Sequence, residues 1–305
     1  MSFLGRWFKP EKLENELNRK SAAEFGWGPA WFDNSGFNES LTNKVKRFQR
    51  KSGINPTGIV DLETYEKKLE ELQNPTEEIK NYIIAGKEKI PINWDKVITF
   101  DSREGLELPE SHYRKVINYR NPRMFVVHWD ATLSSKTTYK ILMKRGISVH
   151  FGIDNDGTIH QWMDAEDIGW HAGNRIVNNR SIGVEISNAY YLKYQNHYEK
   201  SGFGLRPIWK NIEVHGQILD PFLGFYNIQL RALKELIKAC NLAYPRIKLD
   251  IPKDRNGELS KTVVPSVKRG RFQGVVNHYN VTKRKIDSAG CPLDKIVEQI
   301  KNEQD

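Results

Sequence analysis

The chain has 305 residues, 38% hydrophobic and 28% charged, so it is long enough for a buried core and too apolar for a disordered protein. Its formal charge of +9 favours an anionic partner, such as nucleic acid, a membrane surface or an acidic cell-wall polymer, without choosing among them. No stretch approaches the roughly 18 apolar residues of a transmembrane helix, so we expect no membrane insertion.

The N-terminal segment bears on where the protein is made. A short apolar stretch at the N-terminus is broken by Arg6 and Lys9, and it lacks the apolar run and cleavage site of a signal peptide. We therefore expect synthesis in the cytoplasm, with action elsewhere depending on release by other means.

The two cysteines, Cys240 and Cys291, are too few for a disulfide framework. Apolar residues recur at helical spacing around Cys240, which predicts a core thiol.

Residues 41–69 predict a small helical unit. One helix face carries three apolar residues at helical spacing: Leu41, Val45 and Phe48. Gly53 stands where a glycine commonly ends a helix, and Asp61 is suited to cap the helix that follows. We expect a small all-α, three-helix domain over residues 1–75.

The same stretch resembles a known wall-binding module. The sequence VKRFQRKSGINPTGIVDLETYEKKL is similar to the short peptidoglycan-binding domain of many bacterial and phage wall hydrolases. The residues that carry the resemblance are Phe48, Gln49, Gly53, Ile54, Thr57, Gly58, Val60, Asp61, Thr64 and Leu69. The resemblance implies that residues 1–75 bind the cell wall. Residues 76–95 are polar with scattered apolar positions, and we expect a linker or a connecting helix there.

From residue 96 the pattern changes to strands mixed with helices. Short apolar runs predict strands, and apolar residues at helical spacing predict helices. The expected strands are residues 124–130, 181–187 and 274–279, with a hairpin over 149–164 that turns at Asn155-Asp156-Gly157. The expected helices run from Ser134 or Ser135 to Gly146, through Cys240, and from Pro292 onward. We predict an α/β domain over residues 96–305, with a central mixed β-sheet flanked by helices.

Two of the eight histidines stand at the ends of predicted strands. His128 follows FVV and His278 follows VVN, and neighbouring parallel strands present such residues to one cleft. Zinc accepts two imidazoles with a carboxylate or a thiolate, so a zinc site is one interpretation and structural histidines are the other. The apolar residues of SIGVEIS share one face, so Glu185 faces a second, polar surface. That surface is either a substrate floor or a solvated strand face.

Five motifs in order carry a resemblance to a known enzyme family. They are VVHWDAT, SVHFGIDNDGTIHQWMD, IGWHAG, NNRSIGVEIS and NHYNVTKRKID. They are similar to those of zinc N-acetylmuramoyl-L-alanine amidases, which are related to phage lysozyme-type amidases and animal peptidoglycan recognition proteins. The resemblance spans most of residues 120–300. It implies hydrolysis of the amide bond between the lactyl group of N-acetylmuramic acid and L-alanine of the stem peptide, with Zn²⁺ as the cofactor.

The resemblance also implies roles for individual residues. The first two zinc ligands of the family fall on His128 and His278. The third is Asp in some branches and Cys in others, which leaves Asp287 and Cys291 as candidates. The family's catalytic lysine lies two positions before the ligand. Lys285 stands two before Asp287, whereas an alanine stands two before Cys291. We therefore expect Asp287 as the ligand, with Cys291 as the alternative, and Lys285 as a catalytic residue.

Further positions follow from the same resemblance. The family's catalytic acid, in the motif S-I-G-[IV]-E, matches Glu185, which acts as general base and then general acid. Other branches use a tyrosine just before the residue that matches His150, and this chain has Val149 there. We expect His150 and His171 to line the cleft and bind substrate. Residues 189–224, long and rich in Tyr, His and Gly, are a candidate roof over the cleft.

Three classes of function fit these observations unequally. The first is a phage or bacterial wall-lytic amidase, an endolysin or a virion-carried hydrolase that acts on the wall after release. The second is a non-catalytic peptidoglycan-binding protein, since some relatives lose the metal and keep the groove; a complete set of ligands and catalytic residues argues against it. A nucleic-acid binder rests on charge alone, and no recognised motif supports it. We expect a monomer that binds peptidoglycan and no nucleic acid.

Overall fold

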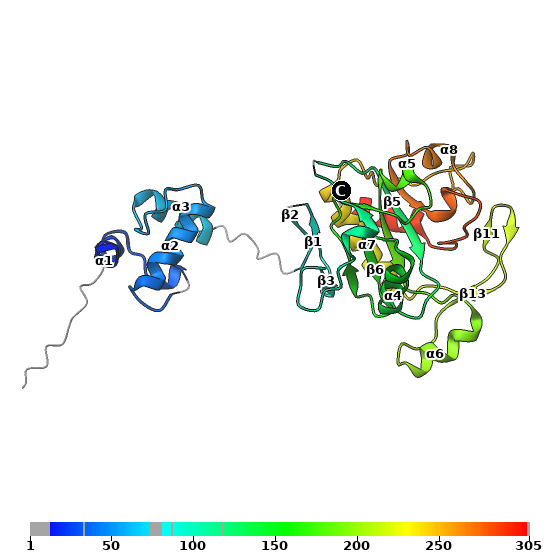
Figure 1. Ribbon diagram of the computed structural model, residues 1–305, viewed down its shortest axis with the longest axis horizontal. Helices are drawn as coiled ribbons and strands as arrows, with labels where there is room; N and C mark the ends of the chain where they lie inside the picture. The colour runs from blue at the N-terminus through cyan, green and yellow to red at the C-terminus, as the bar shows by residue number, and fades with distance from the viewer. Residues whose placement is uncertain (1–12, 33, 74–80, 87, 118, 304–305) are drawn as a thin grey trace, which may run out of the picture. The chain divides into compact units, whose positions relative to one another are not determined.

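The structure is a computed structural model, and it describes residues 13–32, 34–73, 81–86, 88–117 and 119–303. The chain divides into two compact units, Met1–Glu78 and Ile79–Asp305 (Figure 1). Each unit has a hydrophobic core of its own. The two units are described separately below.

The first unit is helical over its described residues, as the apolar spacing predicts. It contains α1 (Leu13–Phe25), the 3₁₀ helix η1 (Pro29–Phe32), α2 (Glu39–Lys51) and α3 (Leu62–Gln73). The three apolar residues predicted on one face of α2, Leu41, Val45 and Phe48, are buried in its core. Gly53 has a φ of +74°, which glycine adopts readily, and the Asp61 carboxylate accepts from Thr64 N at 2.9 Å as the expected cap of α3.

Residues 82–85 and 88–91, expected within a linker or a connecting helix, form the two strands of a β-hairpin instead. Strand β1 (Tyr82–Ala85) pairs antiparallel with β2 (Glu88–Pro91). Ile83 and Ile90 are buried in the main core of the second unit. An alternating apolar face that packs against a larger core is stable as a hairpin and cannot serve as a solvated connection. The second unit therefore begins before residue 96.

A six-stranded mixed sheet forms the centre of the second unit, in the order β14-β5-β9-β6-β7-β3. Its strands are β3 (Val97–Ile98), β5 (Met124–Trp129), β6 (Phe151–Ile153), β7 (Ile159–Gln161), β9 (Ser181–Ile186) and β14 (Gly274–Asn277). Strands β14, β5, β9 and β6 run parallel, and β6 and β7 form the predicted antiparallel hairpin. The expected α/β class is confirmed. The last strand is shorter than expected, because His278 opens the 3₁₀ helix η4 (His278–Asn280).

Helices pack on both faces of this sheet (Figure 1). On one face, strand residues share the main core with α7 (Asn227–Ala243) and α9 (Leu293–Asn302), and the thiol of Cys240 is buried there as expected. On the other face, a smaller cluster joins Met124 and Val126 to α5 (Arg175–Asn178) and α8 (Pro265–Lys268).

The predicted boundaries of α4 (Ser135–Arg145) are confirmed in detail. The Ser134 hydroxyl accepts from Thr137 N at 3.2 Å, and Gly146 ends the helix with a left-handed φ of +62°.

The remaining short elements are η2 (Glu110–His112), β4 (Tyr113–Arg114), β8 (Ile168–Gly169), η3 (Leu192–Tyr194), α6 (Gln195–Lys200), β10 (Ile208–Trp209), β11 (Glu213–Val214), β12 (Gln217–Ile218) and β13 (Phe222–Leu223).

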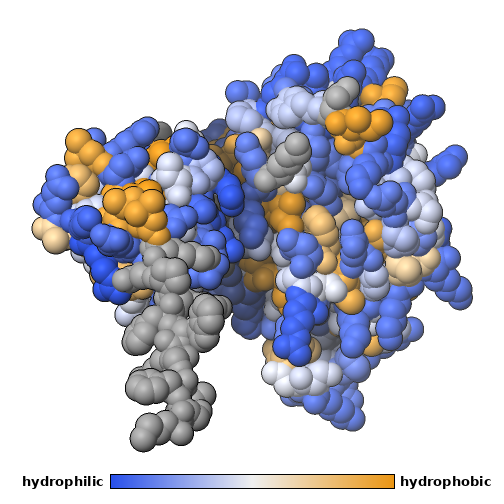
Figure 2. Space-filling view, turned by 60° about the vertical axis from the view of Figure 1, so that its left-hand side comes forward, coloured by the Kyte–Doolittle hydropathy of each residue, from blue (hydrophilic) through white to orange (hydrophobic). Residues whose placement is uncertain are grey.

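The surface of both units is largely hydrophilic on the face shown in Figure 2, with hydrophobic patches between hydrophilic residues. Among the helices that the structure describes, none has the length and apolar character needed to cross a membrane.

Candidate metal centre and catalytic cleft

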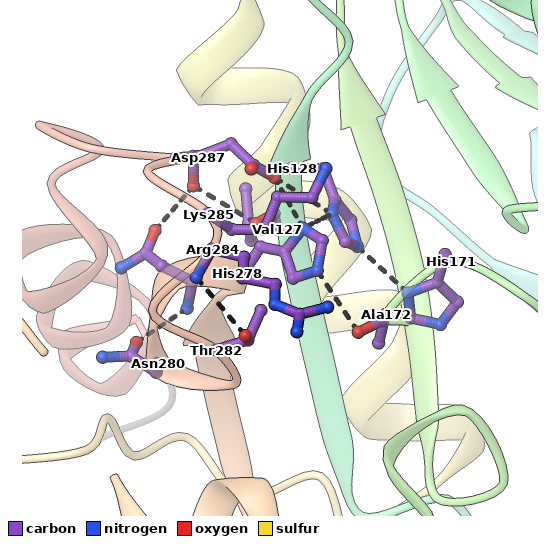
Figure 3. Close-up of polar contacts among 12 residues, drawn as sticks. Val127, His128, His171, Ala172, His278, Asn280, Thr282, Arg284, Lys285 and Asp287 are labelled. Carbon is purple, nitrogen blue, oxygen red and sulfur yellow. Dashed lines mark hydrogen bonds and ion pairs between the residues drawn. The ribbon is translucent and has the colours of Figure 1, made fainter. Parts of the chain in front are cut away.

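Three side chains from distant parts of the chain meet at the carboxyl edge of the parallel strands. His128 lies near the end of β5, His278 directly follows β14, and Asp287 lies in the loop before α9. Because Val127 and Asn277 are partners in the parallel ladder, the histidines that follow them leave the sheet side by side. In Figure 3 the two imidazoles and the carboxylate point toward one another.

The ligand atoms of this cluster are close together. His128 Nδ1 lies 2.9 Å from His278 Nδ1 and 3.2 Å from Asp287 Oδ2, and His278 Nδ1 lies 2.9 Å from the same oxygen. All three side chains are buried. Ligand atoms of a tetrahedral zinc site are roughly 3.3 Å apart, given bonds to the metal of about 2.0 Å. The cluster therefore has spacing that could hold a metal ion, with only slight expansion needed.

A chain of hydrogen bonds behind His128 determines which of its nitrogens faces the cluster. The Ser181 hydroxyl donates to the Val177 carbonyl at 2.8 Å, so toward His171 Nε2, 3.3 Å away, it acts as the acceptor. Burial holds the pKa of His171 well below its ordinary value, so the ring is neutral and its Nδ1 is free to accept. His128 Nε2–H donates to that Nδ1 at 3.0 Å. His128 consequently presents an unprotonated Nδ1 to Asp287.

The backbone orients His278 in the same way. His278 Nε2 lies 3.3 Å from the carbonyl oxygen of Ala172, which can only accept, so Nε2 carries a hydrogen and Nδ1 is the nitrogen available to a metal. The Nδ1 atoms of both histidines and a carboxylate oxygen of Asp287 thus converge on one point. With neutral imidazoles, all three atoms offer lone pairs to a cation placed between them. Two imidazoles and one carboxylate, with the far nitrogens hydrogen-bonded, are a ligand set typical of catalytic zinc. The residues therefore fit a zinc ion.

Burial and charge set the protonation states of this cluster. Burial, aided by the charge of His278, lowers the pKa of His128 to about 4, so this imidazole is neutral near pH 7. Burial alone favours a higher pKa for Asp287, but the neighbouring His278 and His128 outweigh it and hold that pKa well below its usual range. A neutral imidazole and an ionised carboxylate are the forms that bind a metal.

Glu185 stands beside His128 on the neighbouring strand. The two residues are direct partners in the β5–β9 ladder, so their side chains share the polar face of the sheet. Burial and the negative charge of Asp287 raise the pKa of Glu185 well above its usual value, and Lys285 opposes that shift. One carboxylate oxygen of Glu185 is buried with no hydrogen-bond partner among the described residues. A carboxyl group in this state is suited to exchange a proton with a ligand.

A cleft of about 520 Å³ opens over the cluster and Glu185. Three exposed cations also line it, Arg145 on α4 and the adjacent Arg284 and Lys285 on the loop that carries Asp287. Figure 3 shows the last two beside the histidines. The cations give the cleft a positive rim, which favours a substrate with negative charge or one that becomes negative during reaction.

Asp130 braces the two strands that carry the polar residues, a role the sequence analysis missed. Its carboxylate accepts from the backbone N–H groups of Thr132 and Asn188, both at 2.9 Å, and from the hydroxyls of Ser187 and Thr138. Burial raises the pKa of Asp130 to about 6, although these four hydrogen bonds oppose the shift. An aspartate as the last residue of a predicted buried strand was the available signal.

His150 does not reach the cleft, contrary to the expectation that it binds substrate. Its side chain is fully buried, its Nε2 lies 3.0 Å from the carbonyl oxygen of Asp167, and its Nδ1 accepts from Gly183 N at 3.0 Å. Both ring nitrogens are therefore engaged by backbone groups. The structure places His150 as a packing residue beneath the polar face of the sheet.

His171 lines the cleft as expected, but its nitrogens are engaged by His128 and Ser181 rather than free for substrate. Gly183 provides the room for this ring, because a Cβ there would lie 2.7 Å from His171 Nδ1. The geometry therefore indicates that His171 orients the His128 imidazole. The glycine within the SIGVE strand was the sequence signal for a close neighbour.

Cys291 lies in the apolar core rather than in the polar cluster. It is 3% exposed, belongs to the same hydrophobic cluster as Ala289 and Leu293, and burial raises the pKa of its thiol far above the usual value. A thiol binds zinc as the thiolate, which this environment disfavours. Within the described residues the convergent group consists of His128, His278 and Asp287.

Residues 189–224 do not form the expected roof. In the part of this segment that the structure describes, only Tyr190 lines the cleft. Arg206 fastens the segment to the domain, since its buried guanidinium donates to the carbonyl oxygens of Ser187 at 2.8 Å and Gly224 at 2.9 Å. The segment therefore flanks the cleft.

Comparison with known families agrees with this description. A family model for N-acetylmuramoyl-L-alanine amidase matches residues 118–290, more than half of the chain, and a model for a peptidoglycan-binding domain matches residues 32–67. An α/β domain with a polar cleft at the edge of its sheet, in a chain that also carries a wall-binding match, defines a peptidoglycan hydrolase. The chain belongs to the N-acetylmuramoyl-L-alanine amidase family.

Several solved structures resemble the chain in fold. A selenomethionine derivative of AmpD is 17% identical, with a TM-score of 0.37 over 67% of this chain and 98% of that one. AmpDh3 from Pseudomonas aeruginosa is 21% identical, with a TM-score of 0.39 over 64% and 66%. The amidase LysC from Clostridium intestinale is 17% identical, with a TM-score of 0.38 over 66% and 99%. A search of curated proteins finds no match.

Proposed function

We propose that the protein is a zinc amidase of peptidoglycan that cleaves the bond between N-acetylmuramic acid and L-alanine. His128, His278 and Asp287 hold the zinc ion. The observation that carries the proposal is the convergence of their three ligand atoms, 2.9 to 3.2 Å apart, in a cleft whose floor also holds Glu185. Two imidazoles and a carboxylate leave a fourth position for water, as a catalytic site requires.

Glu185 is the general base and then the general acid of this reaction. Zinc in the site would lower the pKa of a bound water towards about 7 and polarise the scissile carbonyl. Glu185, held beside His128 by the strand pairing, takes a proton from the attacking water and delivers it to the amine of the departing L-alanine. Its raised pKa supports both transfers near neutral pH, since the carboxyl is then neither a very weak base nor a very weak acid.

Lys285 stabilises the negative charge that develops on the former carbonyl oxygen. Its ammonium group lines the cleft two residues from Asp287 and is exposed to a ligand there. One donor of this kind contributes roughly 3 kcal/mol to the transition state. His171 and the carbonyl of Ala172 orient the two imidazoles through their Nε2 atoms, so that both Nδ1 atoms face the metal site.

Metal analysis paired with product analysis tests this proposal. The full chain is expected to bind about one zinc ion and to release new L-alanine amino termini from peptidoglycan, and removal of the metal is expected to stop the release. Hydrolysis at full rate in rigorously metal-free protein would contradict the role of zinc. Binding to peptidoglycan without release of amino termini would identify a non-catalytic binding protein instead.

We further propose that residues 1–75 bind the wall, and that the protein acts there after release from the cell, as an endolysin or as part of a virion. The support is the match of residues 32–67 to a peptidoglycan-binding domain, together with a charge of +9 that suits anionic wall polymers. A chain that begins at Ile79 is expected to cleave soluble muropeptides and to sediment less with purified sacculi. Equal sedimentation of the two chains would contradict the wall-binding assignment.

A further inference from the structure

A strip of aromatic rings leads out of the catalytic cleft. Trp129 and Tyr190 line the cleft, and their rings stack with centroids 5.2 Å apart and planes at 17°. Tyr190 also stacks on Tyr191, at 4.2 Å and 29°, and Tyr194 lies 6.4 Å beyond. Tyr191 is 51% exposed. We call these four residues the aromatic strip.

The aromatic strip is held firmly by the segment that follows β9. The carbonyl of Tyr190 accepts from Leu223 N at 2.7 Å, and the Tyr190 hydroxyl donates to that of Tyr191 at 2.8 Å. The buried Arg206 ties the start of the same segment to β9 through the carbonyl of Ser187. A large aromatic ring presented to solvent by a fixed backbone is typical of a binding surface.

We propose that the aromatic strip is the subsite for the glycan strand of peptidoglycan. The inference rests on the proposed function, because the N-acetylated sugars next to the muramic acid are then continuous with the bond that is cut. A pyranose ring offers a face of C–H groups, which packs on an aromatic ring, and an edge of hydroxyl groups. That edge suits the paired hydroxyls of Tyr190 and Tyr191.

The charged side chains are arranged differently in the cleft and at the aromatic strip, which suits the cleft to the peptide and the strip to the sugar chain. Arg145, Arg284 and Lys285 line the cleft, and these cations suit the carboxylates of an acidic stem peptide. At the aromatic strip, Lys193 instead lies over the rings, with Nζ 5.4 Å from the Tyr191 centroid and 5.1 Å from that of Tyr194. This exposed, flexible side chain moves aside at small cost when a sugar ring takes its place.

Inhibition by a peptide-free sugar chain tests the strip in the full-length protein. The probe is a tetrasaccharide of N-acetylglucosamine, which has no muramoyl–alanine bond, added during hydrolysis of a soluble muropeptide. We expect it to inhibit the unmodified protein, and Tyr191→Ala to weaken the inhibition about tenfold, the usual worth of one aromatic contact. The matched control is Tyr119→Ala, which removes a tyrosine that is 73% exposed and outside the cleft lining. Its inhibition should equal that of the unmodified protein.

Substrates of two glycan lengths provide a second measurement. A disaccharide peptide is expected to have a lower KM than the matching monosaccharide peptide, and Tyr191→Ala is expected to bring the two KM values together. If the unmodified protein cleaves both substrates with equal KM and the tetrasaccharide does not inhibit, the strip is not a glycan subsite and the amidase assignment stands. If no L-alanine amino termini appear from either substrate, both proposals are overturned.

Discussion

The two faces of strand β9 have different tasks. Ile182, Val184 and Ile186 are fully buried in the main core, whereas Glu185, between the last two, reaches the catalytic cleft. The apolar face stabilises the fold by removing hydrocarbon from water. The polar face buries a carboxyl group with a raised pKa, which opposes folding at neutral pH. Alternation along one strand thus separates residues that stabilise the core from the residue that lines the cleft.

The largest expected effect on the polar side is that of Asp287→Ala. It removes one of the three converging ligand atoms, so we expect loss of bound zinc and a fall in turnover of about a thousandfold or more. Metal content and release of L-alanine amino termini measure the two losses. A variant that keeps one zinc ion per chain would show that another residue completes the site.

Glu185→Gln tests the proton transfer alone. The amide keeps the shape of the side chain and cannot accept a proton, so turnover should fall about a thousandfold while zinc stays bound. Metal analysis is the control, and the zinc content of the variant should equal that of the unmodified protein. A variant with nearly full turnover would remove Glu185 from the mechanism.

The same substitution tests the cost of burying Glu185 in metal-free protein. Since the folded-state pKa is raised, stability is highest below the unfolded pKa of about 4.3, where both states are protonated, and declines as pH rises towards the folded pKa. Glu185→Gln abolishes this decline. Unfolding in denaturant should therefore show a gain in stability for the variant at pH 7 and none at pH 4. An equal gain at both values would contradict the raised pKa.

Lys285→Ala is expected to lower turnover about a hundredfold with zinc retained, because it removes one charge beside the developing oxyanion. Lys283→Ala is the matched control, an exposed lysine in the same loop that does not line the cleft. Steady-state kinetics on one muropeptide should separate the two variants. Equal losses of turnover in the two variants would show that the effect comes from the overall positive charge of the loop rather than from the position of Lys285.

On the apolar side, Ile182→Val should change stability and leave chemistry intact. Loss of one buried methylene group costs about 1 kcal/mol in the free energy of unfolding. Denaturant unfolding measures the loss, and turnover below the unfolding transition should match that of the unmodified protein. A large fall in turnover would contradict the view that the apolar face of β9 affects stability alone.

The smallest effect is expected from Cys291→Ser. Cys291 belongs to the apolar core although it lies only four residues after Asp287, so zinc content and turnover should not change. A buried hydroxyl in place of the thiol should cost no more than about 2 kcal/mol of stability. Loss of zinc in this variant, with zinc retained in Asp287→Ala, would reverse the ligand assignment.

Local signals account for the parts of the fold that the sequence predicts well. Ser134 caps the start of α4 and Gly146 ends it, and the turn before Gly157 closes the β6–β7 hairpin. The β1–β2 hairpin was missed because its strands are short and gain stability from burying Ile83 and Ile90 in a distant core. Contacts of that kind leave little trace in local composition.

The candidate site shows the same limit. His128, His278 and Asp287 converge as the family motifs imply, because those motifs record a shared arrangement in space. The expected substrate contact of His150 failed, since both of its nitrogens bind backbone groups far away in the chain. No spacing rule reveals whether a histidine near a cleft faces into it or away from it.

The ladder partnership of His128 and Glu185 has a consequence for heat inactivation. Their separation depends on the spacing of adjacent strands, about 4.8 Å, which backbone hydrogen bonds maintain until the strands part. A pair placed on two mobile loops would drift out of alignment at temperatures well below global melting. Here His128 and Glu185 stay aligned for as long as β5 and β9 remain paired. Heat should therefore separate His128 from Glu185 only when the sheet itself melts.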